Sequence, residues 1–427
     1  MNTIDRLPAI DTSKRDEYKT NPLPLLLSVT KEYCYHMVKS NRMSRINLVG
    51  TSNCTGCAAC VSICPVNSIT LSEDDEGFLQ PKIDRNTCIN CHKCEKTCPI
   101  INKETTRKNV ETSAYAAINK NESIRAKSSS GGVFYSLAKW TIERGGVVFG
   151  ARFDDNWDVM HDYSEAIEGI IPFMGSKYVQ SRIGDTYKQA KSFLEQGRWV
   201  LFSGTPCQLG GLRAFLGKEY EQLIQVDLIC HGVPSPSVWR SYLKDFVTDG
   251  EILSVSFRDK KDGWLRFQNI TTTTTTTTIR EHQKENPYFR GFLKNVYLRK
   301  SCYNCQFRTF HRLTDITLAD YWGVNELCPE MFDDKGTSVV FAHTEKGNSI
   351  LLELNNEVEL LPQTRENATK RNPSMDRENP KDSKRRRFFR LFRLTSFKNA
   401  QYVIDKDSFD KRVLRKIKKM VLNLIDF

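Results

Sequence analysis

What this 427-residue chain lacks narrows its class before any motif is considered. It has no run of eighteen or more apolar residues, so we expect no transmembrane helix. Its first residues also lack the charged, apolar and small-residue segments of a secretory signal peptide. The chain has fourteen cysteines, most of them in patterns typical of cluster ligands, which predicts a protein of the reducing cytoplasm.

Acidic residues are the minority charge: 51 Asp and Glu stand against 63 Lys and Arg, a formal net charge of +12. Most of the excess lies in residues 381–427, which hold 15 Lys and Arg against 5 Asp and Glu. The rest of the chain is nearly neutral, so the charge describes a basic tail. We therefore predict no nucleic-acid partner.

Within this tail, apolar residues recur at steps of three and four between 408 and 425, and Lys and Arg fill most other positions. This pattern predicts a basic amphipathic helix. Such a helix can lie on an anionic membrane surface as a peripheral contact, dock on an acidic partner, or pack on its own protein. The apolar positions are Phe409, Val413, Ile417, Met420 and Leu424.

Two cysteine runs with the same spacing, C-x2-C-x2-C-x3-C-P, begin at Cys54 and Cys88. This is the spacing of bacterial two-cluster ferredoxins, in which the fourth cysteine of each run binds the other cluster. Structural zinc usually takes paired C-x2-C hooks, and disulfide frameworks belong to short secreted chains. We therefore predict two 4Fe-4S clusters. The ligand sets are Cys54, Cys57, Cys60 and Cys98 for the first cluster, and Cys88, Cys91, Cys94 and Cys64 for the second.

The predicted organisation has four parts. Residues 1–48 form an amino-terminal extension of uncertain role, and residues 49–102 form an α+β ferredoxin-like two-cluster module. A polar linker leads into residues 113–375, and the basic tail covers 381–427.

Residues 113–375 alternate between strand and helix patterns, which predicts an α/β domain with a largely parallel sheet. The strands fall near 114–118, 147–149, 199–202 and 223–229, and the helices near 134–143, 185–196, 208–216, 238–247 and 287–300. A β-like insert over 254–278 includes eight consecutive threonines. The threonines are either part of an extended hairpin or a low-complexity polar arm.

Four further cysteines stand at suggestive places. Cys207 and Cys230 follow predicted strands, at the edge where open α/β sheets place their sites. Cys302 and Cys305 form a C-x2-C hook. The spacing is compatible with a third 4Fe-4S cluster, with zinc, or with a redox-active pair at Cys302 and Cys305.

Two turns precede helices and can hold an anion at the helix amino end. One is Ser128-Ser-Ser-Gly-Gly132, and the other is Gly204-Thr-Pro. Neither is a G-x-G-x-x-G motif, so each can equally be an ordinary helix cap.

Several motifs together resemble the beta subunit family of coenzyme F420 hydrogenases and dehydrogenases. They are the Ser128–Gly132 turn, Gly175-Ser-Lys-Tyr-Val-Gln-Ser181, Gly204-Thr-Pro-Cys-Gln208, Asp227-Leu-Ile-Cys-His-Gly-Val-Pro-Ser235, Cys302-Tyr-Asn-Cys305 and Asp315-Ile-Thr-Leu-Ala-Asp-Tyr-Trp-Gly323. Asn372-Pro-Ser followed by Arg385-Arg-Arg-Phe-Phe389 is similar to the carboxyl end of that family. The resemblance covers roughly residues 50–395.

The resemblance implies an FAD site, a further 4Fe-4S cluster and hydride exchange with the deazaflavin coenzyme F420. The ligands that the resemblance implies for this further cluster are Cys207, Cys230, Cys302 and Cys305. The flavin-site candidates are Ser129, Ser130, Gly131, Gly132, Lys177, Tyr178, Gln180 and Thr205. Lys177 is the candidate donor to a flavin carbonyl or phosphate. His231 is a candidate proton shuttle, with a packed, satisfied histidine as the alternative.

These expectations combine into one functional hypothesis. The chain is predicted to be an oxidoreductase that passes electrons between a hydride carrier and ferredoxin-type clusters, with a ferredoxin or another redox protein as partner. The alternative is an electron-delivery or scaffold subunit without its own substrate, serving a partner enzyme such as one of surface-polysaccharide synthesis.

Overall fold

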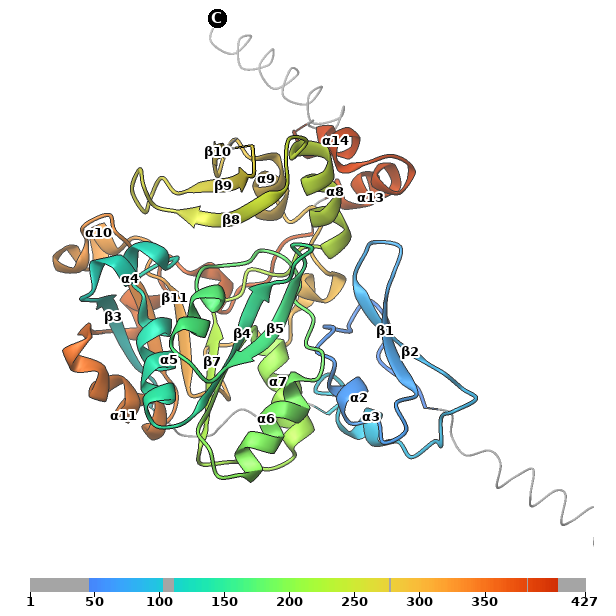
Figure 1. Ribbon diagram of the computed structural model, residues 1–427, viewed down its shortest axis with the longest axis horizontal. Coiled ribbons are helices and arrows are strands. Elements are labelled where there is room, and N and C mark those ends of the chain that lie inside the picture. The colour runs from blue at the N-terminus through green and yellow to red at the C-terminus, as the bar shows by residue number, and fades with distance from the viewer. Residues whose placement is uncertain (1–45, 103–110, 276–277, 382, 406–427) are drawn as a thin grey trace, which may run out of the picture. The chain divides into compact units, whose positions relative to one another are not determined.

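The computed structural model describes residues 46–102, 111–275, 278–381 and 383–405 (Figure 1). The predicted helix over 408–425, and all of the predicted extension before residue 46, lie outside the described residues. The chain divides into a small unit, Met1–Asn47 with Ile89–His92, and a large unit, Leu48–Cys88 with Lys93–Phe427. The contacts and pockets described below lie within the large unit.

The ferredoxin module is built from one hairpin and two short helices. Strands β1 (Ile69–Glu73) and β2 (Leu79–Ile83) pair antiparallel. The helices α2 (Ala59–Ser62) and α3 (Lys93–Lys96) contact each other, and each ends just before a Cys-Pro pair. Since proline disfavours helix in the residue before it, each helix stops where the sequence pattern predicts.

Among the described residues, the main sheet has eight strands in the order β13-β3-β12-β11-β7-β6-β4-β5. They are β3 (Ser113–Asn119), β4 (Val147–Phe153), β5 (Val159–Ser164), β6 (Val200–Ser203), β7 (Leu223–Leu228), β11 (Ile316–Asp320), β12 (Ser338–Ala342) and β13 (Val358–Gln363). Strands β4, β6, β7 and β11 are parallel neighbours, and the pairings on both flanks are antiparallel. The predicted α/β class is confirmed: the core of the sheet is parallel and its flanks are not.

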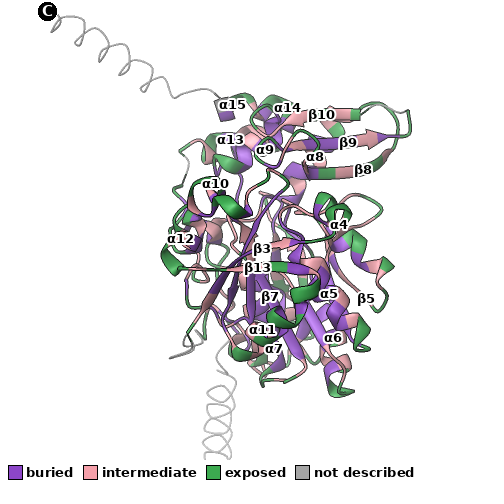
Figure 2. Cartoon of the chain, turned by 90° about the vertical axis from the view of Figure 1, so that its left-hand side faces the viewer, coloured by how far each residue is buried: buried purple, intermediate pink, exposed green. Residues whose placement is uncertain are grey.

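Helices cover both faces of this sheet, and the strands β6, β7 and β12 in its interior are largely buried (Figure 2). Side chains alternate along a strand, so Leu201 of β6 packs with Leu137 of α5, whereas Phe202 packs with Tyr187 of α6 and Leu212 of α7. The helices of this part of the chain are α4 (Glu122–Lys127), α5 (Val133–Glu143), α6 (Thr186–Glu195), α7 (Pro206–Leu216), α8 (Pro236–Phe246), α9 (Pro287–Leu293), α10 (Val324–Leu327), α11 (Glu345–Glu353) and α12 (Arg365–Thr369). Of these, α8 and α9 pack with the insert described below. The described residues also form the 3-10 helices η2 (Glu168–Phe173), η3 (Lys300–Asn304), η4 (Pro329–Met331), η5 (Leu354–Asn356) and η6 (Pro373–Met375).

The insert is a separate antiparallel sheet of β8 (Ile252–Asp259), β9 (Gln268–Thr273) and β10 (Thr278–His282), in the order β10-β9-β8. The threonine run supplies the end of β9 and the start of β10, with Thr272 opposite Thr278. Thr271 and Thr273 are buried, because β-branched side chains pack well on a pleated surface. The hairpin interpretation of the run is therefore confirmed.

One predicted helix is wrong in length. The helix expected over 287–300 ends after Leu293, because Asn295 adopts a positive φ of 58° that a helix cannot continue through. The residues that follow, Val296, Tyr297 and Leu298, are buried in the core next to α8 and α9. Burial of this extended segment replaces the second half of the predicted helix.

The basic tail needs a similar correction. Helices α13 (Arg385–Leu394), α14 (Phe397–Ala400) and α15 (Tyr402–Asp405) follow residue 383, and Phe388, Phe389 and Phe397 are buried in the core with α8 and α9. The arginines of α13 made this segment look like part of a separate tail, but its phenylalanines anchor it. Residues 384–405 therefore belong to the folded body.

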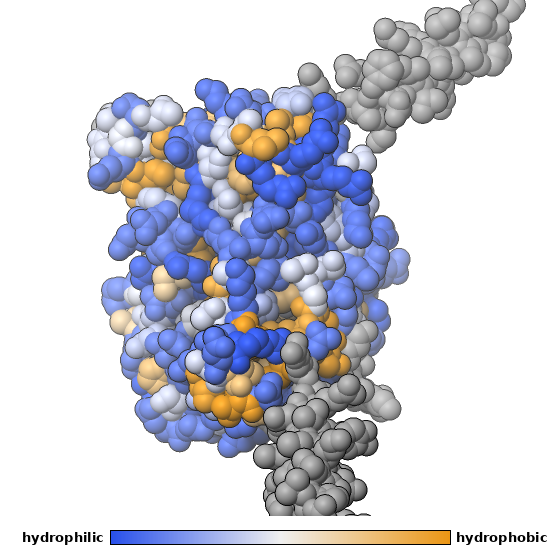
Figure 3. All heavy atoms as spheres, turned by 90° about the vertical axis from the view of Figure 1, so that its right-hand side faces the viewer, coloured by the Kyte–Doolittle hydropathy of each residue, from blue (hydrophilic) through white to orange (hydrophobic). Residues whose placement is uncertain are grey.

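Helix α13 also contacts the ferredoxin hairpin. The turn between β1 and β2 is acidic, and Glu76 forms ion pairs with Arg385 of α13 and, at 3.5 Å, with Lys300. Glu73 pairs with Arg240 of α8 at 2.6 Å. Gly77 has a positive φ, and a Cβ there would lie 2.1 Å from the Cβ of Ser237, so only glycine fits this contact. The acidic turn thus contacts the body through ion pairs with α8, α13 and Lys300. The face of the molecule shown in Figure 3 is mainly hydrophilic, with smaller apolar patches.

Within the described residues, none of the helices combines the length and the apolar character needed to span a bilayer.

Candidate functional site

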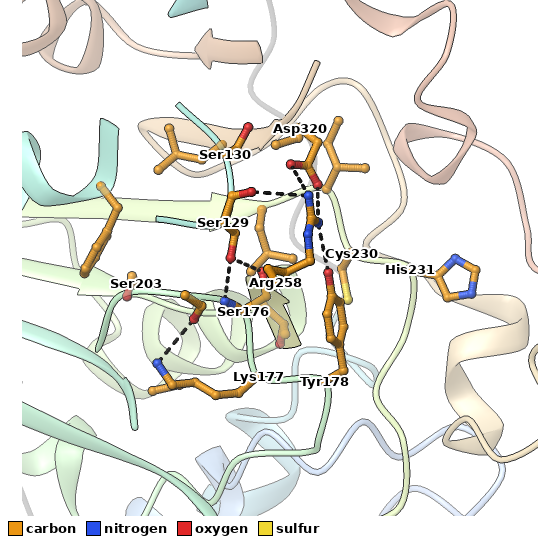
Figure 4. A pocket seen from close by; sticks show the side chains of 18 of the residues that line it. Ser129, Ser130, Ser176, Lys177, Tyr178, Ser203, Cys230, His231, Arg258 and Asp320 are labelled. Carbon is orange, nitrogen blue, oxygen red and sulfur yellow. Dashed lines mark hydrogen bonds and ion pairs between the residues drawn. The ribbon is translucent and has the colours of Figure 1, made fainter. Parts of the chain in front are cut away.

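A cavity of about 590 Å³ lies at the carboxyl ends of β6, β7 and β11, with the insert contributing to its wall (Figure 4). This is the edge at which open α/β sheets bind ligands. Its lining combines aromatic and aliphatic side chains with a few polar groups, as is typical of cofactor pockets. The predicted site residues that line it are Ser129, Ser130, Gly132, Lys177, Tyr178, Thr205, Cys230 and His231.

The serine–glycine turn before α5 is held by hydrogen bonds of its own. The Ser129 hydroxyl accepts from the backbone N–H of Ser176 at 2.7 Å, and the Ser130 hydroxyl donates to the carbonyl of Thr337 at 2.8 Å. The Gly131 N–H donates to the Ser338 hydroxyl at 2.9 Å. Gly131 is not among the residues that line the cavity, so its place is to fix the turn against β12.

Lys177 lies at the cavity wall, but its ammonium is already engaged. Its Nζ donates to the carbonyl oxygens of Pro172, Met174 and Gly175, at 2.7, 2.8 and 3.2 Å. Burial lowers the pKa of Lys177 to about 7, so both protonation states are accessible near neutral pH.

Gln180 lies away from the cavity. Its Oε1 accepts from Arg299 at 3.0 Å, and the Arg299 Nε–H donates to the carbonyl of Cys54 at 2.7 Å. The position of Gln180 therefore connects the flavin-site motif to the ferredoxin module, and it does not face the cavity.

A buried ion pair that sequence reasoning missed stands in the middle of the cavity wall. Arg258 of β8 donates to both carboxylate oxygens of Asp320, at 2.8 and 3.0 Å, to the Tyr178 hydroxyl and to the Ser129 carbonyl (Figure 4). The Arg258 side chain is only 3% exposed, and its Nε–H is buried without a partner in the described structure. Asp320 belongs to the motif Asp315–Gly323, but no motif in the insert indicated a role for Arg258.

His161 of β5 is a second residue that the sequence did not single out. Its Nε2 is 3.0 Å from the Ser203 carbonyl, which can only accept, so Nε2 carries the proton and Nδ1 accepts from Ser181. Burial lowers the pKa of His161 to about 4, so the ring is neutral near pH 7. Gln208 donates to the same Ser181 hydroxyl and caps Thr205, which orders this part of the wall.

The four additional cysteines meet around one small pocket next to the cavity. Cys207 is in the first turn of α7, Cys230 follows β7, and Cys302 and Cys305 come from η3 and the residue after it. Burial raises the pKa of Cys230 to about 12 and that of Cys302 to about 11, with the neighbouring thiols adding to both shifts. We call this the four-cysteine pocket.

A second small pocket is lined by Cys54, Cys57, Cys60 and Cys98, and we call it the ferredoxin pocket. These are the four ligands that crossed ligation predicts for the first cluster. Burial raises the pKa of Cys57 to about 11. In the other set, Cys94 is buried in α3, Cys64 lies 3.3 Å from the Ser68 hydroxyl, and Cys91 belongs to the small unit.

The cavity and the two pockets share walls. Cys230, Gly232 and Val233 line both the cavity and the four-cysteine pocket. Thr55 lines both the four-cysteine pocket and the ferredoxin pocket. Consecutive sites therefore have lining residues in common.

Comparison with known proteins now identifies both regions. Residues 197–366 match the family model for coenzyme F420 hydrogenase/dehydrogenase that describes the C terminus of the beta subunit, and residues 53–100 match the 4Fe-4S dicluster domain. The chain thus contains one region that matches the 4Fe-4S dicluster domain and one that matches the C-terminal domain of this beta subunit family. The family resemblance and the two predicted 4Fe-4S clusters are thereby confirmed.

Two curated relatives match parts of this chain. An uncharacterized protein of Methanocaldococcus jannaschii is 24% identical over 216 residues, 44% of this chain and 59% of that protein. A protein named Ferredoxin 7Fe, from Hydrogenibacillus schlegelii, is 42% identical over 52 residues, 12% of this chain and 60% of that protein. The chain thus spans about three fifths of the length of these relatives.

Among solved structures, a xenon derivative of the F420-reducing NiFe hydrogenase complex from Methanosarcina barkeri is similar to the chain. The TM-score is 0.41 at 18% identity, covering 74% of this chain and 96% of the matched chain.

Proposed function

We propose that this chain is an iron–sulfur flavoprotein that passes electrons between a hydride carrier in the cavity and the clusters of its dicluster domain. The observation that carries this proposal is the shared walls: Cys230 joins the cavity to the four-cysteine pocket, and Thr55 joins that pocket to the ferredoxin pocket. Residues 49–102 would then be the port for a redox partner such as ferredoxin, and residues 113–375 the catalytic body.

The cavity suits a flavin in size and in chemistry. A volume of about 590 Å³ lies within the range of cofactor sites. Phe289, Phe292 and Trp322 offer flat apolar surfaces for an aromatic ring system, and the buried Nε–H of Arg258 is a donor that still needs an acceptor. When bound, FAD supplies the exchange between a two-electron hydride and single electrons.

The four-cysteine pocket suits a third 4Fe-4S cluster. Four thiols converge from separate elements, and the pKa values of Cys230 and Cys302 are raised by burial. These cysteines would hold such a cluster as thiolates, because a coordinating thiol is deprotonated. Zinc or a redox-active Cys302–Cys305 pair would use the same sulfur atoms, and iron analysis separates these alternatives.

The residues of the cavity have separable proposed roles. His161 is neutral and donates to Ser203, so it fixes the end of β6 and carries no exchangeable charge. Arg258 and Asp320 hold each other and orient Tyr178 and the serine turn. Lys177 holds a proton at Nζ with a pKa of about 7, which suits proton exchange at the cavity wall.

His231 is less suited to that role. Its Nε2 lies 2.7 Å from Oδ1 of Asn295, and its ring packs edge-on against Phe292. Burial lowers the pKa of His231. These contacts favour the alternative of a packed, satisfied histidine.

Anaerobic purification followed by iron, sulfide and flavin analysis tests the proposal. We expect about twelve irons and one FAD per chain, since each 4Fe-4S cluster holds four irons. Replacing Cys302 and Cys305 by serine is expected to remove about four irons and to leave the dicluster intact. Loss of zinc instead would refute the third cluster.

A chain with about eight irons, no flavin, and electron exchange with reduced ferredoxin would support an electron-delivery subunit instead. A reduction assay then identifies the hydride carrier. We propose coenzyme F420 or a related deazaflavin, and reduction of a nicotinamide carrier alone would contradict that assignment.

A further inference from the structure

Two arginines line the four-cysteine pocket, and their charges are balanced differently. Arg312 forms a buried ion pair with Asp227 at 2.9 Å, so its charge is neutralised. Arg308 forms no ion pair within the described residues. Its guanidinium donates to the carbonyl oxygens of Arg377, Cys230 and His231, at 2.9, 3.2 and 2.5 Å. Carbonyl groups fix the position of Arg308 but leave it a full positive charge.

One buried donor of the Arg308 guanidinium remains available for a ligand. The Nε–H is buried and has no hydrogen-bond partner among the residues that the structure describes. An unmatched buried donor is costly, and the sulfur atoms of a cluster or its thiolates are acceptors that the pocket itself would provide. The charge of Arg308 acts on both the Cys230 and the Cys302 sulfur atoms.

The neighbouring ferredoxin pocket has a different wall. Apart from its cysteines, it is lined by apolar or small residues, including Val49, Ala58, Leu71, Pro81 and Ile100, and its lining includes no charged side chain among the described residues. Arg299 lies near both pockets: its Nε–H donates to the carbonyl of Cys54, and its charge also acts on the Cys302 thiol.

Charge and hydrogen bonds at the sulfur atoms help to set the potential of a cluster. Each electron added makes a cluster more negative, so a nearby positive charge stabilises the reduced state and raises the potential. A site with an unneutralised arginine therefore attracts electrons more strongly than an apolar site with the same four ligands.

We propose that Arg308 raises the reduction potential of the four-cysteine site above that of the ferredoxin pocket, and so directs electrons toward the cavity. This rests on the proposed function. A low-potential electron-donor protein reduces the ferredoxin site by one electron and is itself oxidised. That electron moves to the four-cysteine site with no bond formed or broken and no proton transferred. Two such transfers, with one proton, supply the equivalent of a hydride to the cavity ligand.

The test is a redox titration of the full chain, purified anaerobically and followed by electron paramagnetic resonance. In Arg308→Gln we expect one of the cluster signals to shift to lower potential and the others to stay. Removing a unit charge at this range should change the electron partition between the two sites roughly tenfold, which is ~59 mV for a one-electron couple. Arg308→Lys should keep most of the wild-type potential.

A second test variant and a control variant accompany this titration. Asn379 donates to the same His231 carbonyl as Arg308, so Asn379→Asp places a carboxylate beside the guanidinium and should lower the same signal. Arg198→Gln removes an equal charge at the amino end of β6, the opposite edge of the sheet from the cavity, and should change nothing.

The outcomes separate the two proposals. If wild-type protein contains four irons fewer than three clusters need, the third cluster is refuted together with the proposed function. If iron is complete but neither Arg308→Gln nor Asn379→Asp lowers a potential, the role of Arg308 is overturned and the proposed function stands. A signal lowered equally by Arg198→Gln would also overturn it, because the effect would then follow net charge alone.

Discussion

The ferredoxin pocket and the four-cysteine pocket hold the same number of thiols, but the chain assembles them in opposite ways. Cys54, Cys57 and Cys60 come from one short segment, so local geometry already brings three ligands together. Cys207, Cys230 and the pair at Cys302 and Cys305 come from α7, the end of β7 and η3. The first site depends on a motif and the second depends on the whole folded body. A mutation that destabilises the body should therefore disrupt the four-cysteine pocket before the ferredoxin pocket.

The largest effect is expected from Arg312→Met. This change leaves the Asp227 carboxylate, which is 0% exposed, without its counter-ion. Breaking such a buried pair costs about 3–5 kcal/mol. On anaerobic heating, the four irons assigned to the four-cysteine pocket should be released well before the eight of the dicluster domain, as followed by visible absorbance.

Arg198→Gln serves as the control for that experiment, because Arg198 is a more exposed arginine paired with Glu165 at the surface. Its unfolding free energy should change by less than about 1 kcal/mol. Simultaneous release of all irons in Arg312→Met would show that the two sites are not separable.

In the body, the dependence of the unfolding free energy on pH tests the buried, neutral state of His161. The pKa of His161 is lowered by burial from 6.5 to about 4, so the unfolded chain binds its proton more tightly than the folded chain. The unfolding free energy should therefore fall as the pH drops from 6.5 to about 4, by at most about 1.4 kcal/mol per pH unit. In His161→Gln this part of the slope should disappear, as measured by denaturant titration at several pH values. An unchanged slope would contradict the buried, neutral state of His161.

A third variant addresses the contact between the two regions. A Cβ on Gly211 of α7 would lie 2.9 Å from Cβ and 3.0 Å from Sγ of Cys57. Gly211→Ala should therefore push the ferredoxin pocket away from α7 at a cost of about 1–3 kcal/mol. We expect faster proteolysis of the ferredoxin module at unchanged iron content. Gly50→Ala is the matched control, since a Cβ at Gly50 meets nothing within 4 Å.

The smallest effect is expected at the acidic turn. Glu76→Gln removes the carboxylate that faces Arg385 and Lys300, at a site that is partly exposed. The loss should be at most about 1 kcal/mol and should shrink as salt is added, because screening weakens the same pairs in the parent protein. Glu143→Gln on α5 breaks an exposed helix pair with Lys139 and is the control. A loss that does not depend on salt would show that packing, and not charge, holds the turn.

The sequence was most informative where the determinants are local. The two cysteine runs, the short helices before each Cys-Pro pair and the alternation of buried strands with helices all depend on neighbouring residues. The positions of Cys207 and Cys230 after buried strands were enough to place both at one edge of the sheet. The parallel core and the dicluster domain could therefore be predicted without coordinates.

The missed features depend on contacts between distant segments. Arg258 reaches the cavity only because the insert covers the end of the main sheet, and His161 reaches it from a flanking antiparallel strand. Asn295 ends a helix that composition alone would continue. At α13, the arginines outnumber the phenylalanines that decide its burial, so composition pointed to solvent. None of these outcomes has a local signature.

Thr55 gives the molecule one further property. It belongs to the ferredoxin module, yet it forms part of the wall of the four-cysteine pocket, whose other lining residues come from the body. A body expressed without the module would have an opening at this point, through which water and dioxygen could reach the thiolates. The module is thus also a lid for the site beside it. A foreign ferredoxin joined to this body would need a residue in the place of Thr55 to close the four-cysteine pocket.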